Sequence, residues 1–167
     1  FPARVPNTPS KLGFVFLDPY GAELEWSTVE AIGRAGTFDV LINLSVMAVF
    51  RQSPKGRPPS PEIQDNITKF MGGPEWYEKC YPDTPTLTLP GISIDTIDKK
   101  RPDVADGLAR CYISRLKTCF RHVSSFYMMR NSKGSPLYAL ILASQAELAV
   151  KRISEIFNKY KKKELSH

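Results

Sequence analysis

Residues 12–21 read Leu12-Gly13-Phe14-Val15-Phe16-Leu17-Asp18-Pro19-Tyr20-Gly21. The apolar run at the start of this stretch is too short for a buried helix, and turn residues bound it. That pattern is typical of a β-strand covered on both faces. The Asp18-Pro19 pair ends the strand, because proline cannot donate to the hydrogen-bond ladder of a sheet. We therefore predict a buried strand that presents Asp18 and Tyr20 at its carboxyl end.

The residues that follow alternate between helical and extended patterns. Ser27-Thr28-Val29-Glu30 is a capping box, which predicts a helix that begins there and runs to about Ala35, before Gly36. Residues 38–44 form a second apolar strand, and Ser45 can cap a short helix through residue 50. The order strand, helix, strand, helix predicts a parallel sheet with right-handed crossovers.

Residues 52–101 differ from what precedes them. Residues 53–61 are rich in proline, residues 61–71 predict a helix with Pro61 in its first turn, and Gly72-Gly73-Pro74 ends it. A short aromatic helix around Trp76 and Tyr77 follows, and then an irregular stretch. A segment of this length inside a compact domain is typical of a lid or a binding element, so we predict a helical and loop insertion.

The last third of the chain predicts a helix, a hairpin and a helix. A long helix begins at about Asp103, and strands over residues 123–130 and 137–143 are joined by a hairpin-length turn. Ser144-Gln145-Ala146-Glu147 is a second capping box. The final helix is expected to bury one apolar stripe: Ala149, Ile153, Ile156, Phe157 and Tyr160.

Composition places the chain among globular proteins. Its 167 residues are 42% hydrophobic and 24% charged, which suits one well-buried core. We predict a proline-rich lead-in over residues 1–10, typical of a piece of a longer protein, and a single α/β domain over residues 11–167. The net charge of +6 favours an anionic partner such as nucleic acid. The indication is weak, because part of the charge belongs to the tail 159–163, and such a run is usually a solvated helix end.

Several classes of protein are disfavoured. The apolar runs are far shorter than a membrane span, and no segment has the pattern of a signal peptide. Cys80, Cys111 and Cys119 lack metal-ligand spacing, and the chain has only two histidines, which argues against a structural zinc site. We expect a cytoplasmic protein that holds no metal and does not enter the membrane.

Asp18-Pro19-Tyr20-Gly21 is the candidate active site, because open α/β sheets bind ligands outside the carboxyl ends of their strands. In amino-methyltransferases an Asp/Asn-Pro-Pro-Tyr segment at this place has a definite role. Its side-chain oxygen and a backbone carbonyl accept hydrogen bonds from the target amino group, and its ring stacks on the target base. The match here is partial. An equally weighted alternative is a tight turn that merely ends the strand.

Other candidates are weaker. Asn43 ends the second strand and could face the cleft, or could satisfy a neighbouring backbone group. Arg51, with Lys55 and Arg57, could hold phosphates or could belong to a solvated basic loop. Trp76 belongs to a group of aromatic residues that could stack on bases. The favoured alternative is that the group forms a small core under the loop. Its members are Phe70, Trp76, Tyr77 and Tyr81.

The element order resembles the C-terminal half of a Rossmann-like, class I methyltransferase-type sheet, with a terminal antiparallel hairpin. At the residue level the chain resembles the three-Cys-motif partner protein family. The resemblance is carried by residues 14–21, 26–30, 39–43 with 47–49 and Arg51, 70–76 with Tyr81, and 138–144. The block Asp18-Pro19-Tyr20-Gly21 is its most specific part.

The resemblance implies an S-adenosylmethionine-dependent methyltransferase that acts on an amino group of nucleic acid, with catalytic Asp18, Pro19 and Tyr20. Gly21, Asn43, Arg51 and Trp76 would contact the substrate. The cofactor-binding half has no counterpart in this sequence, so S-adenosylmethionine is expected only for the full-length protein. The three cysteines in the family's name belong to its partner, a three-Cys-motif protein.

Two other readings remain open: a non-catalytic methyltransferase-fold module that acts through a partner, and a different nucleotide-binding enzyme. For the methyltransferase type we predict four main strands in the spatial order first, second, fourth, third, with the fourth antiparallel. The missing half also predicts an exposed apolar flank on the strand that begins at Leu12. The missing N-terminal half or a second copy of the chain would cover that flank.

Overall fold

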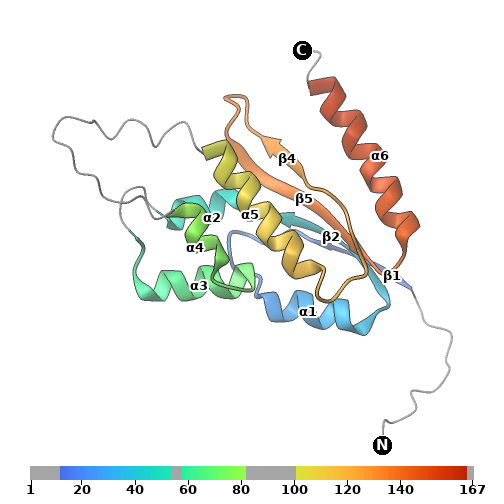
Figure 1. Cartoon of the computed structure of the whole chain (residues 1–167), viewed down its shortest axis with the longest axis horizontal. Helices are drawn as coiled ribbons and strands as arrows, with labels where there is room; N and C mark the ends of the chain where they lie inside the picture. The colour runs from blue at the N-terminus through green and yellow to red at the C-terminus, as the bar shows by residue number, and fades with distance from the viewer. Residues whose placement is uncertain (1–11, 54–57, 82–100, 165–167) are drawn as a thin grey trace, which may run out of the picture.

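The computed structural model describes residues 12–53, 58–81 and 101–164. Five strands form one mixed sheet: β1 (Gly13–Leu17), β2 (Phe38–Leu44), β3 (His122–Val123), β4 (Tyr127–Arg130) and β5 (Pro136–Ser144). Six helices surround it: α1 (Trp26–Ala35), α2 (Val46–Gln52), α3 (Pro61–Met71), α4 (Glu75–Cys80), α5 (Arg101–Leu116) and α6 (Glu147–Glu164). Figure 1 shows α6 apart from the group formed by α1, α3, α4 and α5.

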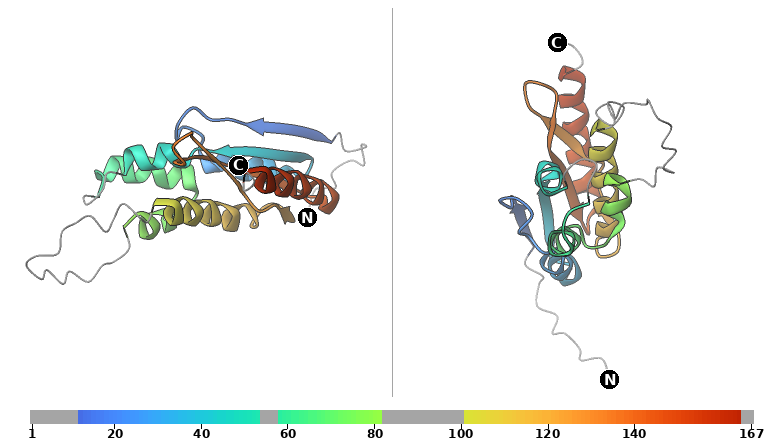
Figure 2. Two further views of the ribbon diagram at one scale, coloured as in Figure 1. Left: turned by 90° about the horizontal axis from the view of Figure 1, so that it is seen from above. Right: turned by 90° about the vertical axis from the view of Figure 1, so that its left-hand side faces the viewer.

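The strand order confirms the predicted arrangement. The path across the sheet is β1-β2-β5-β3, and β4 also pairs with β5. β1 and β2 are parallel, whereas β5 runs antiparallel to β2, β3 and β4. β5 therefore lies between β2 and the strands that precede it in the chain, and β1 is an outer strand of the sheet (Figure 2).

The strand predicted over residues 123–130 is instead two short strands. Ser124 interrupts it, and the Ser124 amide donates to the Leu142 carbonyl at 2.8 Å while the Ser124 hydroxyl accepts from the Leu142 amide at 2.9 Å. A buried serine side chain thus takes over one position of the ladder, which lets the chain bulge between β3 and β4 without losing its hydrogen bonds.

Most of the predicted helices are confirmed, but the first capping box is wrong. α1 begins one residue earlier, at Trp26, and no side chain caps it. Trp26 packs edge-on against Tyr112 of α5, with ring centroids 5.6 Å apart, so a tertiary contact brings it into the helix. Glu30 instead accepts from Arg34 at 2.6 Å. The predicted Ser45 cap holds, since the Ser45 hydroxyl accepts from the Ala48 amide at 3.3 Å. The second capping box is displaced, because α6 begins at Glu147 and the Ser144 hydroxyl accepts from the Ala146 amide at 2.8 Å.

The main core lies on one face of the sheet. Alternate residues of β2 and β5 point into it, together with residues from α1 to α5: Val40, Ile42, Leu44, Ala139, Ile141, Ala143, Val29, Ile67, Phe70, Trp76, Leu108, Tyr112 and Leu116. α6 covers the opposite face, where the Phe157 ring stacks on Tyr127 of β4 at a centroid distance of 5.7 Å. The sheet therefore has one fully covered face and one that is covered in part.

β1 is not covered on both faces, as its apolar run had predicted. Phe14 and Phe16 are 63% and 51% exposed, and Leu12 is exposed as well. The reason is tertiary: α6 contacts β5 and β3, at a distance from the outer strand β1. The separate prediction of an exposed apolar flank beside Leu12 is confirmed.

The final helix also buries less than its apolar stripe predicted. Phe157 is its only fully buried residue among the described positions, and Ala149 and Ile153 are buried in part. Ile156 and Tyr160 are exposed, which contradicts the predicted burial of both. One helix on a half-covered face meets the sheet along a narrow line, so the flanks of its apolar stripe stay in contact with solvent.

Candidate functional site

Two strand ends meet at the candidate site. Leu17 of β1 pairs in register with Ile42 of β2, so Asp18, the first residue after β1, lies level with Asn43, the penultimate residue of β2. The Asn43 Nδ2 donates a hydrogen bond of 2.7 Å to Asp18 Oδ1. The sequence had nominated these two residues separately, and the structure brings them together.

Asn43 is placed to orient the carboxylate. Asn43 is half-buried, whereas Asp18 is exposed. The Asn43 Oδ1 is buried and has no hydrogen-bond partner within the described part of the chain. One end of the amide thus holds Asp18, and Asp18 Oδ2 remains at the surface as an acceptor.

The turn after Asp18 exposes an aromatic ring. Tyr20 is 89% exposed. Gly21 has a φ of 81°, a conformation that glycine adopts more readily than any other residue, and no atom lies within 4 Å of where its Cβ would be. The backbone conformation therefore explains the glycine at position 21, and close packing does not.

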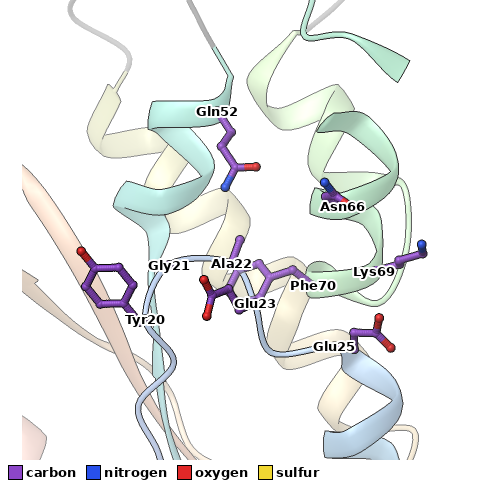
Figure 3. A pocket seen from close by; sticks show the side chains of 9 residues that line it. All are labelled: Tyr20, Gly21, Ala22, Glu23, Glu25, Gln52, Asn66, Lys69 and Phe70. Carbon is purple, nitrogen blue, oxygen red and sulfur yellow. The ribbon is translucent and has the colours of Figure 1, made fainter. Parts of the chain in front are cut away.

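An open pocket of about 460 Å³ lies beside this turn, and Figure 3 shows Tyr20 on one side of it and Asn66 and Lys69 on the other. Its lining comes from three elements, the β1–α1 turn, the end of α2 and α3: Tyr20, Gly21, Ala22, Glu23, Glu25, Gln52, Asn66, Lys69 and Phe70. Sequence reasoning missed the polar part of this lining. The spacing of Asn66 and Lys69, one helical turn apart on α3, is the signal that could have found two of its members.

Lys69 already has a carboxylate partner. Its Nζ lies 2.7 Å from Asp65 Oδ2, and the hydrogen bond to Asp65 raises the pKa of Lys69. The pocket also holds Glu23 and Glu25, so it presents both signs of charge. A mixed lining of this kind suits a polar ligand with donors as well as acceptors, such as a nucleobase.

Of the four predicted substrate contacts, only Gly21 lines the pocket, and Asn43, Arg51 and Trp76 do not. Asp18 does not line it either. Arg51 is exposed on the last turn of α2 and does not line the pocket. Its predicted companions, Lys55 and Arg57, lie outside the described residues. Trp76 is 1% exposed, and its Nε1 donates to Thr68 Oγ1 at 2.9 Å.

The predicted substrate contact by Trp76 is therefore wrong, because a buried ring presents no face to a base. A structural role is confirmed for this group, but its rings belong to the main core or pack against it and do not form a separate small core under the loop. Tyr77 packs against Trp76 at 5.6 Å and against Tyr81 at 5.0 Å between ring centroids, and Phe70 is fully buried. These rings fix α4 against the main core.

The described residues beside β1 lack the glycine-rich turn that holds a nucleoside cofactor. The β1–α1 turn contains one glycine, Gly21. No group of three or more histidine, cysteine or carboxylate side chains in the described ranges is arranged to hold a metal ion. Among the described residues, no helix has both the length and the apolar character needed to cross a bilayer.

Comparisons with protein-family models, with curated proteins and with solved structures find no match to this chain.

Proposed function

We propose that this chain is the acceptor-binding part of a methyltransferase-type domain. In this proposal Asp18 and Tyr20 position an amino group of a nucleic-acid base for methyl transfer from S-adenosylmethionine. The observation that carries it is the 2.7 Å hydrogen bond from Asn43 Nδ2 to Asp18 Oδ1, at the carboxyl ends of two parallel strands.

The kind of group that Asp18 can recognise follows from its hydrogen-bonding capacity. A carboxylate only accepts hydrogen bonds, so Asp18 recognises a group that donates, such as an amino group. Because Asn43 holds Oδ1, the second oxygen has a fixed direction in which to accept. Two acceptors, Oδ2 and the Pro19 carbonyl, would orient the amino nitrogen so that its lone pair faces the methyl donor. The exposed Tyr20 ring would stack on the same base.

The cofactor would be held elsewhere than by the described residues of this chain. S-adenosylmethionine supplies the methyl group. Its binding site would come from a preceding segment or from a partner chain placed against β1, and the resemblance to three-Cys-motif partner proteins supports this arrangement. The share of this chain is to bind the acceptor, to orient its nitrogen and to exclude water around it.

The test compares four variants in the full-length protein. Asp18→Ala should abolish methyl transfer from labelled S-adenosylmethionine to nucleic acid, mainly in kcat, because the lost contact acts in the chemical step. Asn43→Ala should lower kcat less. Tyr20→Ala should weaken acceptor binding by roughly 1–3 kcal/mol, and Tyr20→Phe should keep most of it because the stacking ring remains.

Melting temperature on the same variants separates function from folding. The proposal expects all four to melt near the wild-type temperature. If Asp18 and its neighbours only form a turn, stability and activity will fall in proportion, and the two Tyr20 variants will not differ in function. That result would remove Asp18 and Tyr20 from the active site.

A second candidate is a non-catalytic module that binds a partner through its outer strand. The observation in its favour is the exposure of Phe14 and Phe16 on β1, at the edge of the sheet. Exposed apolar edge strands pair readily with other chains. This candidate expects partner binding to depend on Phe14 and Phe16 and to be indifferent to Asp18→Ala.

A further inference from the structure

A second pocket, of about 380 Å³, is lined by residues of α5, of β4 and the segment before it, and of the C-terminal end of α6. We name it the β4 pocket; the residues used below are Asp106 and Arg110 of α5, Phe126 and Arg130 of the β4 segment, and Lys161 and Glu164 of α6. None of them belongs to the Asp18 site. Three cations and two carboxylates give this group a net charge of +1.

One aromatic ring organises two of the cations. Arg110 Cζ lies 5.8 Å from the centroid of the Phe126 ring, and Lys161 Nζ lies 5.9 Å from the same centroid. Cation–π attraction of this kind holds a charged group without neutralising it. Phe126 thus has two cations from different helices, Arg110 and Lys161, within 6 Å of its ring centroid.

The cations lack ion-pair partners in the described part of the chain, where the recorded ion pairs involve other residues. Arg130 donates to the Gly134 carbonyl at 3.1 Å, which orients the guanidinium and leaves its charge unpaired. Glu164 accepts a hydrogen bond from the Tyr127 hydroxyl. Like charges gathered around a pocket favour an anion, and arginine is well shaped for the oxygens of a phosphate.

The same pocket contains a hydrogen-bond acceptor without a donor in the described part of the chain. Asp106 Oδ1 is buried and has no hydrogen-bond partner among the described residues. An unpaired buried acceptor costs free energy that a ligand donor would recover. A nucleotide unit offers both groups, a phosphate for the cations and a hydroxyl or amino group for Asp106.

The β4 pocket opens at the same end of the sheet as Asp18. Tyr127 pairs in register with Leu140, and Leu140 pairs with Asn43. Neighbouring strands lie about 4.8 Å apart, so the backbone at Tyr127 lies about 10 Å across the sheet from Asn43. A single strand of nucleic acid could cover that distance within a few nucleotides.

We propose that the β4 pocket binds a phosphate group of a single-stranded nucleic acid. Arg110 and Lys161, held on Phe126, contact the phosphate together with Arg130. The inference extends the proposed function, since it concerns the strand that carries the acceptor base, but its test needs no methyl transfer and no cofactor.

The test is fluorescence anisotropy of labelled single-stranded RNA and DNA 12-mers, titrated with the whole 167-residue chain at several salt concentrations. Arg110→Gln and Arg130→Gln should each weaken binding about tenfold and reduce the slope of log K against log salt by about 0.7. Phe126→Leu keeps the apolar volume, removes the ring, and should weaken binding less. Circular dichroism melts would verify that the variants fold.

Arg121→Gln is the matched control. Arg121 is an exposed arginine just before β3, whose residue His122 pairs with Ser144 at the other end of the sheet. Its loss removes the same charge and should change the affinity less than twofold. An equal loss in Arg121→Gln and Arg110→Gln would mean diffuse charge attraction and would overturn the proposal.

Two further outcomes decide the ligand. If inorganic phosphate or adenosine monophosphate binds as tightly as the 12-mers, the pocket takes a small anion and the nucleic-acid assignment fails. The strand assignment stands if the 12-mers bind at least tenfold more tightly than either. Binding of the 12-mers is measured without S-adenosylmethionine and without methyl transfer, so a failure of the methyltransferase proposal would leave this result intact.

Discussion

At the scale of single residues, Asn43 decides how Asp18 can act. A carboxylate alone at the end of a strand rotates freely and is indistinguishable from a turn residue. The hydrogen bond from Asn43 Nδ2 gives it a direction, and the exposure of Asp18 leaves the other oxygen to a ligand. This pairing favours a recognition role over a turn role, although the turn at Gly21 is also present.

Cys80 should be unreactive in the folded chain. Burial raises the pKa of its thiol from the usual 9 to about 11, so little thiolate forms near neutral pH. We expect iodoacetamide at pH 8 to label Cys80 much more slowly in the native chain than in urea, as peptide mass spectrometry would measure. Because the folded pKa is the raised one, this thiol supports folding below about pH 9 and loses that contribution as the pH rises through about 11. Equal labelling rates in the native and unfolded chain would contradict the buried position.

At the scale of elements, Gly33 allows α1 to pack closely against the end of α5. A Cβ at Gly33 would lie 2.7 Å from the Phe120 ring and 2.9 Å from Cys119 Sγ. Gly33→Ala should therefore lower the free energy of unfolding by roughly 1–3 kcal/mol, as overpacked cores do, measured by urea denaturation.

Gly107 is the matched control for Gly33. It also lies inside a helix, α5, but its Cβ would meet only Lys79 at an ordinary contact distance of 3.4 Å. Gly107→Ala should stabilise the chain by about 0.5–1 kcal/mol, because alanine loses less backbone entropy in a helix. If both substitutions shift the free energy of unfolding in the same direction, close packing at Gly33 does not explain the effect of Gly33→Ala.

The edge of β1 should drive association of the isolated chain. Phe14 and Phe16 are exposed on an outer strand, and unpaired edges of this kind recruit other strands. Sedimentation velocity should show concentration-dependent association of the wild type, and the double variant Phe14→Lys with Phe16→Lys should remain monomeric. Its melting temperature should stay near that of the wild type at low concentration. A wild-type chain that stays monomeric at high concentration would show that the flank is tolerated in solution.

At the scale of the whole molecule, the proposed function gives this chain the acceptor side of the reaction and assigns the methyl donor to another segment or chain. We expect the 167-residue chain alone to give no measurable heat with S-adenosylmethionine in isothermal titration calorimetry. A nucleoside cofactor needs a glycine-rich turn, and the turn after β1 contains a single glycine, Gly21. The acidic residue at this strand end, Asp18, is assigned to the acceptor in the proposed function. Micromolar binding by this chain would mean that the division into donor and acceptor halves is incorrect.

The sequence by itself determined the local structure of this chain. Short apolar runs, prolines and glycines act over a few residues, so they placed the strands β1 and β2 and the bounds of α3. The position of β5 between β2 and β3 was predicted from the methyltransferase-type topology that the element order resembles. They also placed Asp18 and Asn43 at strand ends, because a strand end is itself a local event.

Only the tertiary structure decided which surfaces are covered. The apolar pattern of β1 matches a fully buried strand, and the stripe of α6 matches a fully packed helix, yet Phe16 and Ile156 are exposed. Trp76 could have faced a ligand or the core, and its burial depends on how α4 packs against the preceding helix α3 and against α5, which is distant in sequence. Burial is a property of what packs against a residue, and neither the Asn43–Asp18 hydrogen bond nor the cations around Phe126 follow from spacing along the chain.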